Sequence, residues 1–126
     1  MDVAFVPAFH RLRYGLLNFG YVDAERLALV AGVLAHVRND DPSLRFAQQM
    51  GSPKEGSDHA RISGLRFRRL LQIDDRDELL TAMVRVVRLL GGSVDIPSLT
   101  KGIYWWSQET KKGWAFDYYE KAQNEA

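Results

Sequence analysis

Apolar residues recur at intervals of three and four through most of this chain, and that spacing is typical of helices that bury one face. The clearest example is the segment 26–37, whose apolar residues on one face are Leu27, Val30, Ala31, Leu34 and Val37. Segments with the alternation or the β-branched enrichment of strands are nearly absent. The sequence therefore predicts an all-α fold of about seven helices.

Capping residues predict where these helices begin and end. Residues that can cap a helix N-terminus precede five of the apolar segments, and they are Asp23, Ser43, Ser63, Asp74 or Asp75, and Asp95. A further short helix is expected over 8–17 after Pro7, and a last helix from about residue 108. The pair Gly91-Gly92 ends the helix over 76–90, because glycine readily adopts the left-handed conformation that terminates helices.

One polar stretch divides the chain. Residues 51–60 read GSPKEGSDHA, a composition typical of a loop or linker. We therefore expect an N-terminal helical bundle over 1–50, a polar loop over 51–62 and a C-terminal four-helix bundle over 63–126.

Composition argues against most enzyme and metal chemistry. The 126 residues contain no cysteine, which excludes disulfides, thiolate metal sites and cysteine nucleophiles. The three histidines, His10, His36 and His59, have no metal-ligand spacing. The acidic group at 74–78 is explained more simply as a helix N-terminus. We expect no catalytic residue, no metal, no cofactor and no small-molecule substrate.

No apolar run is long enough to span a membrane, and the first residues lack the features of a secretory signal. A cysteine-free chain also suits a reducing compartment. We therefore expect a cytoplasmic protein without a membrane partner.

Arginines are concentrated in the middle of the chain. Although the net charge is +1, residues 61–88 hold seven arginines against four acidic residues. Arg66 and Arg69 share one helix face, and Arg85 and Arg88 share another, each at an i, i+3 spacing. If these two helices pack antiparallel, both pairs can line one surface. The planar guanidinium suits phosphate oxygens, so such a surface would bind a nucleic-acid backbone.

The predicted nucleic-acid-binding residues are Arg66, Arg68, Arg69, Arg85, Arg88, Lys111 and Lys112. Two other interpretations stay open. The arginines could be a solvated face partly paired with nearby acids, or they could meet acidic protein partners in a helical protein–protein adapter. The aromatic cluster over 104–119 is expected to be mainly core, with either Trp105 or Trp106 at the surface.

Three segments of this chain resemble the CasB family, the small subunit of the type I-E CRISPR surveillance complex, Cascade. They are residues 7–12 (PAFHRL), residues 65–90 with the LRFRRLL run and the arginine-bearing helix, and residues 104–119 with the YWW and WAFDYY runs. Family members carry another helix before the first segment, whereas six residues precede it here. Two expectations stay open: an N-terminal bundle that lacks a family helix, or a chain start that is misassigned or trimmed. The residues 107–109 (SQE) also stand where the family tends to have basic residues.

The resemblance implies a non-enzymatic, all-α scaffold subunit of two small packed bundles that acts in antiviral defence. It implies a homodimer beside the backbone subunits and the large subunit of Cascade. It further implies that the basic surface contacts CRISPR RNA and target DNA, including the displaced strand, and so stabilises the R-loop. By position, Arg66, Arg69 and Arg85 are the first expected contacts, with Arg68 and Arg88 beside them.

Overall fold

The structure is a computed structural model, and it describes residues 23–125. This part of the chain contains six α-helices, a short 3₁₀ turn and one pair of two-residue strands, so the predicted all-α fold is confirmed. In chain order the elements are α2 (Ala24–Leu34), β1 (Asn39–Asp40), α3 (Phe46–Gly51), α4 (Gly64–Leu71), α5 (Arg76–Leu89), β2 (Ser93–Val94), α6 (Ile96–Tyr104), α7 (Gln108–Lys121) and η2 (Gln123–Glu125). The helix expected over 8–17 lies outside the described residues.

Local capping explains most helix starts. The side chains of Asp23, Ser63, Asp75 and Asp95 each accept a hydrogen bond from a backbone N–H in the first turn of the helix that follows. The prediction that Ser43 caps the third helix is wrong. That helix begins only at Phe46, and the Gln48 side chain accepts a hydrogen bond from the Arg45 backbone N–H instead.

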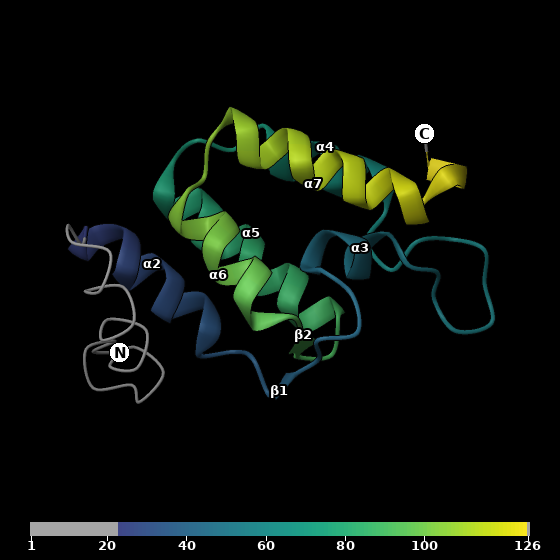
Figure 1. Ribbon diagram of the computed structural model, residues 1–126, viewed down its shortest axis with the longest axis horizontal. Coiled ribbons are helices and arrows are strands. Elements are labelled where there is room, and N and C mark those ends of the chain that lie inside the picture. The colour runs from purple at the N-terminus through teal and green to yellow at the C-terminus, as the bar shows by residue number, and fades with distance from the viewer. Residues whose placement is uncertain (1–22, 126) are drawn as a thin grey trace.

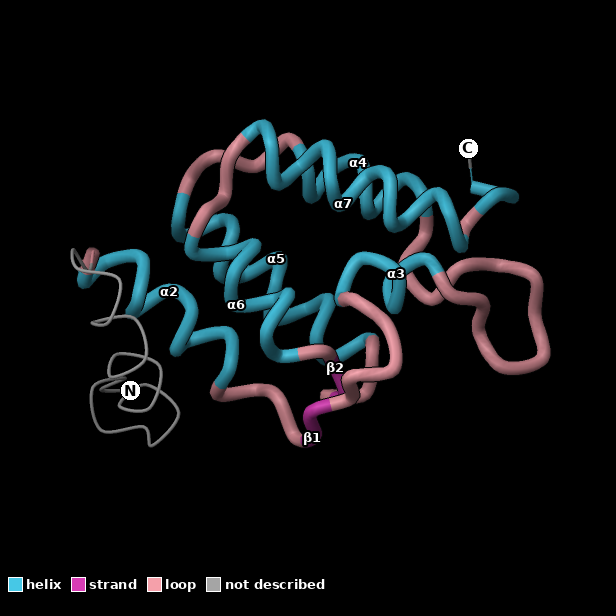
Figure 2. Tube along the Cα trace, viewed as in Figure 1, coloured by secondary structure: helices cyan, strands magenta, loops and turns pink. Residues whose placement is uncertain are grey.

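The small parallel sheet ties the end of α2 to the end of α5, an arrangement that the sequence does not reveal. Asn39 pairs with Ser93 and Asp40 with Val94. The backbone N–H groups of Arg38 and Asn39 both donate to the Gly92 carbonyl, at 2.8 and 3.2 Å. Figure 2 shows this pair of strands as the only magenta segments, below the helices.

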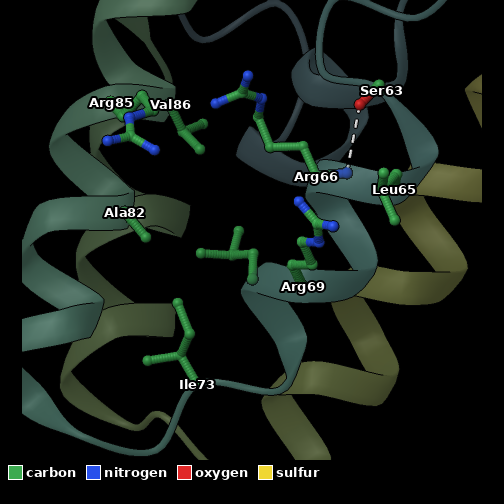
Figure 3. Close-up of a pocket in the computed structure, with 9 residues that line it drawn as sticks. Ser63, Leu65, Arg66, Arg69, Ile73, Ala82, Arg85 and Val86 are labelled. Atoms are coloured by element: carbon green, nitrogen blue, oxygen red, sulfur yellow. Dashed lines mark hydrogen bonds between the residues drawn. The ribbon is translucent and has the colours of Figure 1, made fainter.

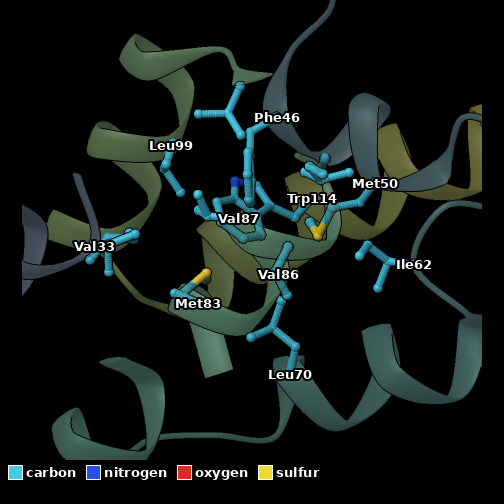
Figure 4. Packing of buried hydrophobic residues seen from close by; sticks show 14 of the residues in the cluster. Val33, Phe46, Met50, Ile62, Leu70, Met83, Val86, Val87, Leu99 and Trp114 are labelled. Atoms are coloured by element: carbon cyan, nitrogen blue, oxygen red, sulfur yellow. The ribbon is translucent and has the colours of Figure 1, made fainter. Parts of the chain in front are cut away.

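The helices share one hydrophobic core. α2 packs on α5 and α6, and α3 packs on α7 (Figure 1). The ring of Phe67 on α4 stacks on the ring of Tyr118 on α7, with centroids 3.9 Å apart. Figure 4 shows the centre of the cluster, where Phe46 and Trp114 meet apolar side chains of α5 and α6. Folding therefore fixes α4 and α5 against the same apolar interior.

The segment between α3 and α4 is irregular, and much of it extends away from the helices (Figure 2). Its last residues belong to the core, since Ala60 and Ile62 are buried. The core contains side chains from both sides of residues 51–62, so among the described residues the packing marks no boundary there. The division into two bundles stays a prediction for the whole chain.

Candidate functional site

α4 presents two arginines to solvent because its apolar residues face inward. Phe67 and Leu70 are buried, and the three-residue spacing between them leaves Arg66 and Arg69 exposed on another face. The Ser63 hydroxyl accepts a hydrogen bond from the Arg66 backbone N–H at 3.2 Å, which fixes the first turn. The two guanidiniums therefore project from one side of a capped helix.

α5 brings a third arginine to the same place. Leu79, Met83, Val86 and Val87 form its buried face, and Arg85 lies on the exposed side. The acidic residues of this helix are in its first turn, near the positive end of the helix dipole, whereas Arg85 is in the second half. The basic end of α5 is thus separated from its acidic start.

The three arginines surround one cavity between α4 and α5. Its volume is about 300 Å³, and its lining residues are Ser63, Leu65, Arg66, Arg69, Leu70, Ile73, Ala82, Arg85 and Val86. Figure 3 shows Arg66 and Arg69 on the α4 side and Arg85 on the α5 side, and the apolar residues Leu65, Ala82 and Val86 come from the same two helices. The wall of the cavity therefore combines cationic and apolar side chains.

None of these three guanidiniums is neutralised within residues 23–125. No ion pair and no side-chain hydrogen bond joins any of them to a described residue. Other arginines differ: Arg45 forms a bidentate pair with Asp117, at 2.8 and 2.9 Å, and that contact raises the Arg45 pKa. The cavity arginines therefore keep their hydrogen-bond donors free for a ligand.

The edge of the cavity is less basic on one side. Arg85 also borders a neighbouring hollow lined by Asp77, Glu78, Thr81 and Ala82. An anion entering between α4 and α5 would be attracted by the three arginines and repelled by the start of α5.

Two predicted arginines do not join this cavity. Arg68 points to the C-terminal segment, where its Nη1 donates to the Glu125 carbonyl at 3.2 Å and to the Tyr119 hydroxyl at 3.4 Å. Arg88 lines a different cavity, together with His36 and Arg38. The prediction grouped Arg88 with Arg85 because both lie on the exposed side of α5. In the structure Arg85 borders the cavity next to α4, whereas Arg88 borders the cavity at the end of α2.

Neither predicted lysine lines the cavity between α4 and α5, and the clearest correction to the predicted binding residues concerns Lys111. Only 7% of Lys111 is exposed, its Nζ lies 2.7 Å from Asp74 Oδ1, and it sits 5.4 Å from the Trp106 ring centroid. We therefore remove Lys111 from the predicted interface, since its ammonium is already paired and its stem is packed. Lys112 is exposed on α7 and does not line the cavity.

Most of the aromatic residues over 104–119 pack in or against the core, as predicted, but Phe116 does not. Trp114 and Tyr118 are buried, and the Trp106 indole N–H donates to the Ile73 carbonyl at 2.7 Å. Trp105 is 54% exposed and Phe116 is 73% exposed. The tryptophan pair therefore does point to two faces, with Trp105 at the surface.

Two further findings concern the described residues only. Residues 23–125 contain no group of three or more histidine, aspartate and glutamate side chains placed to hold a metal ion. No helix in this same range is long and apolar enough to cross a membrane.

Comparison with protein families shows which family the chain belongs to. Residues 20–119 match the family model described as CRISPR-associated protein Cse2. The chain belongs to the Cse2 family. This is the family, also called CasB, that the sequence resembles, and its members are structural subunits of the CRISPR Cascade complex. No curated protein and no solved structure matches the chain.

The match covers every helix described above except the last residues of α7. It therefore includes α4 and α5 with all three cavity arginines. Sequence reasoning identified these arginines from their density and spacing. It did not place His36 and Arg38 in a cavity with Arg88. These two residues follow α2, and the parallel strand pair brings this part of the chain next to the end of α5.

Proposed function

We propose that this Cse2-family protein is a non-catalytic scaffold subunit of a type I-E Cascade that holds a nucleic-acid backbone in the cavity between α4 and α5. The observation that carries the proposal is the convergence of Arg66, Arg69 and Arg85, none of them paired with a described carboxylate. Guanidinium groups bind phosphate oxygens with little desolvation cost. Within Cascade the strand would belong to the CRISPR RNA–target DNA assembly.

The proposed consequence is a longer-lived R-loop. Guide pairing reads the target sequence, and backbone contacts from protein subunits shift a nearly balanced strand exchange toward the open form. Phosphate contacts of this kind carry no sequence information. The subunit would therefore stabilise R-loops on any target that the guide recognises, and the ligand would include the displaced strand, which has lost its pairing partner.

We also propose that the protein acts as a homodimer beside the backbone and large subunits. Trp105, directly after α6, and Phe116, on α7, are large aromatic side chains that are exposed. Exposed aromatics of this size are typical of protein–protein contacts. They leave the α4–α5 cavity free for the strand, since neither of them lines it.

The test replaces all three cavity arginines, as Arg66→Ala/Arg69→Ala/Arg85→Ala. Binding of a single-stranded oligonucleotide is measured by fluorescence anisotropy over a range of salt concentrations. The logarithm of the binding constant falls linearly with the logarithm of the salt concentration, and each lost phosphate contact reduces the steepness of that slope by about 0.7. The slope of the triple variant should therefore be less steep by about 2. In reconstituted Cascade the same variant should shorten the R-loop lifetime.

A control with the same loss of charge is Lys54→Ala/Lys101→Ala/Lys121→Ala, because all three lysines are exposed and none lines the cavity. We expect this control to keep the salt slope. If the arginine variant and the lysine control behave alike, the cavity is not the binding site.

The apolar residues that line the cavity favour one second candidate, a protein–protein adapter. Leu65, Ile73 and Val86 could receive apolar side chains of an acidic partner segment, with the arginines pairing its carboxylates. Charge reversal at Arg66 and Arg69 to Glu separates the two functions. An adapter would fail to assemble into Cascade, whereas a strand-holding subunit would assemble and then lose R-loop stability.

A further inference from the structure

A second basic cavity lies where α2 and α5 end. It has a volume of about 420 Å³, and its lining residues are Ala35, His36, Arg38, Arg88, Gly91 and Gly92. Unlike the cavity between α4 and α5, it has no leucine, isoleucine or valine in its wall. Its lining therefore suits a small anion better than an apolar group.

The backbone holds Arg38 in place at this cavity. The Arg38 N–H donates to the Gly92 carbonyl at 2.8 Å, and the strand pair that follows fixes the next two residues. The stem of Arg38 lies against Gly92, where an added Cβ would be only 3.0 Å from Arg38 Cγ. Gly92 also has a φ of +77°, which strongly favours glycine. The arginine is thus positioned by a residue that tolerates little substitution.

Arg88 connects this cavity to the first one. It is exposed on α5 and follows Arg85 by three residues, which is a rise of about 4.5 Å along the helix. Arg85 borders the cavity on the α4 side, and Arg88 borders the cavity on the α2 side. Neighbouring outward-facing arginines of one helix therefore join the two cavities.

The charge balance at the second cavity favours an anion. Within residues 23–125, neither Arg38 nor Arg88 forms an ion pair with a carboxylate. The negative ends of α2 and α5 together offset about one unit of positive charge. Two arginines exceed that amount, so the cavity keeps a net positive charge even with His36 neutral.

We propose that this second cavity binds a phosphate group of the same nucleic-acid strand that the first cavity holds. Arg38 and Arg88 contact the phosphate oxygens, and His36 supplies a further hydrogen-bond donor. The proposal rests on the proposed function, because it extends the path of that strand from α4 across α5 to the end of α2. It adds Arg38 and His36 to the interface.

The test is the double variant Arg38→Ala/Arg88→Ala, compared with the cavity triple variant in the same anisotropy assay. Loss of two phosphate contacts should lower the log–log salt slope by about 1.4. The conservative variant Arg38→Lys/Arg88→Lys should keep the slope, because each ammonium still neutralises one phosphate. Circular dichroism before each titration confirms that the variants are folded.

The outcomes separate the two proposals. An unchanged slope for Arg38→Ala/Arg88→Ala, with a reduced slope for the triple variant, overturns the second cavity and leaves the first. Unchanged slopes for both sets overturn both. A loss equal to that of the charge-matched control Lys54→Ala/Lys101→Ala would mean that net charge alone is responsible, and that result also rejects the second cavity.

Discussion

Lys111 gives the sharpest test of the structure, because the sequence assigns it to a binding surface and the fold assigns it to the core. Its side chain is only 9% exposed, while its partner Asp74 is 84% exposed. Lys111→Ala removes three buried methylene groups, worth about 2.4 kcal/mol at ~0.8 kcal/mol each. The ion pair with an exposed carboxylate adds less than about 1 kcal/mol. We therefore expect a loss of about 2–3 kcal/mol in the free energy of unfolding.

Lys111→Met is the matched variant, because it keeps a long apolar stem and removes only the charge. Its expected cost is within about 1 kcal/mol, from the lost ion pair and the lost contact of the ammonium with the Trp106 ring. Urea denaturation followed by circular dichroism, with linear extrapolation, gives both values. The same proteins are titrated with single-stranded oligonucleotide.

The two measurements together decide the role of Lys111. We expect both variants to keep the salt slope of strand binding, because the Lys111 ammonium already faces Asp74. If instead Lys111→Met is fully stable and lowers the slope by about 0.7, Lys111 contacts a phosphate and its placement in the core is wrong.

Two further predictions concern stability. The buried Tyr118 hydroxyl donates to the Ile62 carbonyl, and burial raises its pKa. The stability that this group contributes is therefore full below the ordinary tyrosine pKa of about 10 and falls as pH rises above it. Tyr118→Phe should cost about 1 kcal/mol at neutral pH and make the alkaline loss of stability shallower in denaturation curves; an identical alkaline curve would contradict this. Gly102→Ala should cost about 1–3 kcal/mol, because its Cβ would lie 2.3 Å from the buried Trp114 indole, whereas Gly113→Ala, with nothing within 4 Å, should be neutral or stabilising in thermal unfolding.

Local patterns in the chain were enough to predict the helices of the described residues and most of their ends. A cap is a hydrogen bond between residues two or three apart, so Asp23, Ser63 and Asp95 could be recognised from local order alone. The inward face of each helix also follows from spacing. For the same reason the exposure of Arg66 and Arg69 was predictable.

Which charged residues share a surface depends on how the helices pack together. Arg66, Arg69 and Arg85 converge because α4 and α5 pack on one core, whereas Arg88 is drawn to Arg38 by a strand pair between residues more than fifty positions apart. Whether a lysine is solvated depends on the helices packed beside it, and spacing along one helix contains no information about its neighbours. The sequence therefore fixes which faces are polar, and long-range packing fixes which of those faces meet.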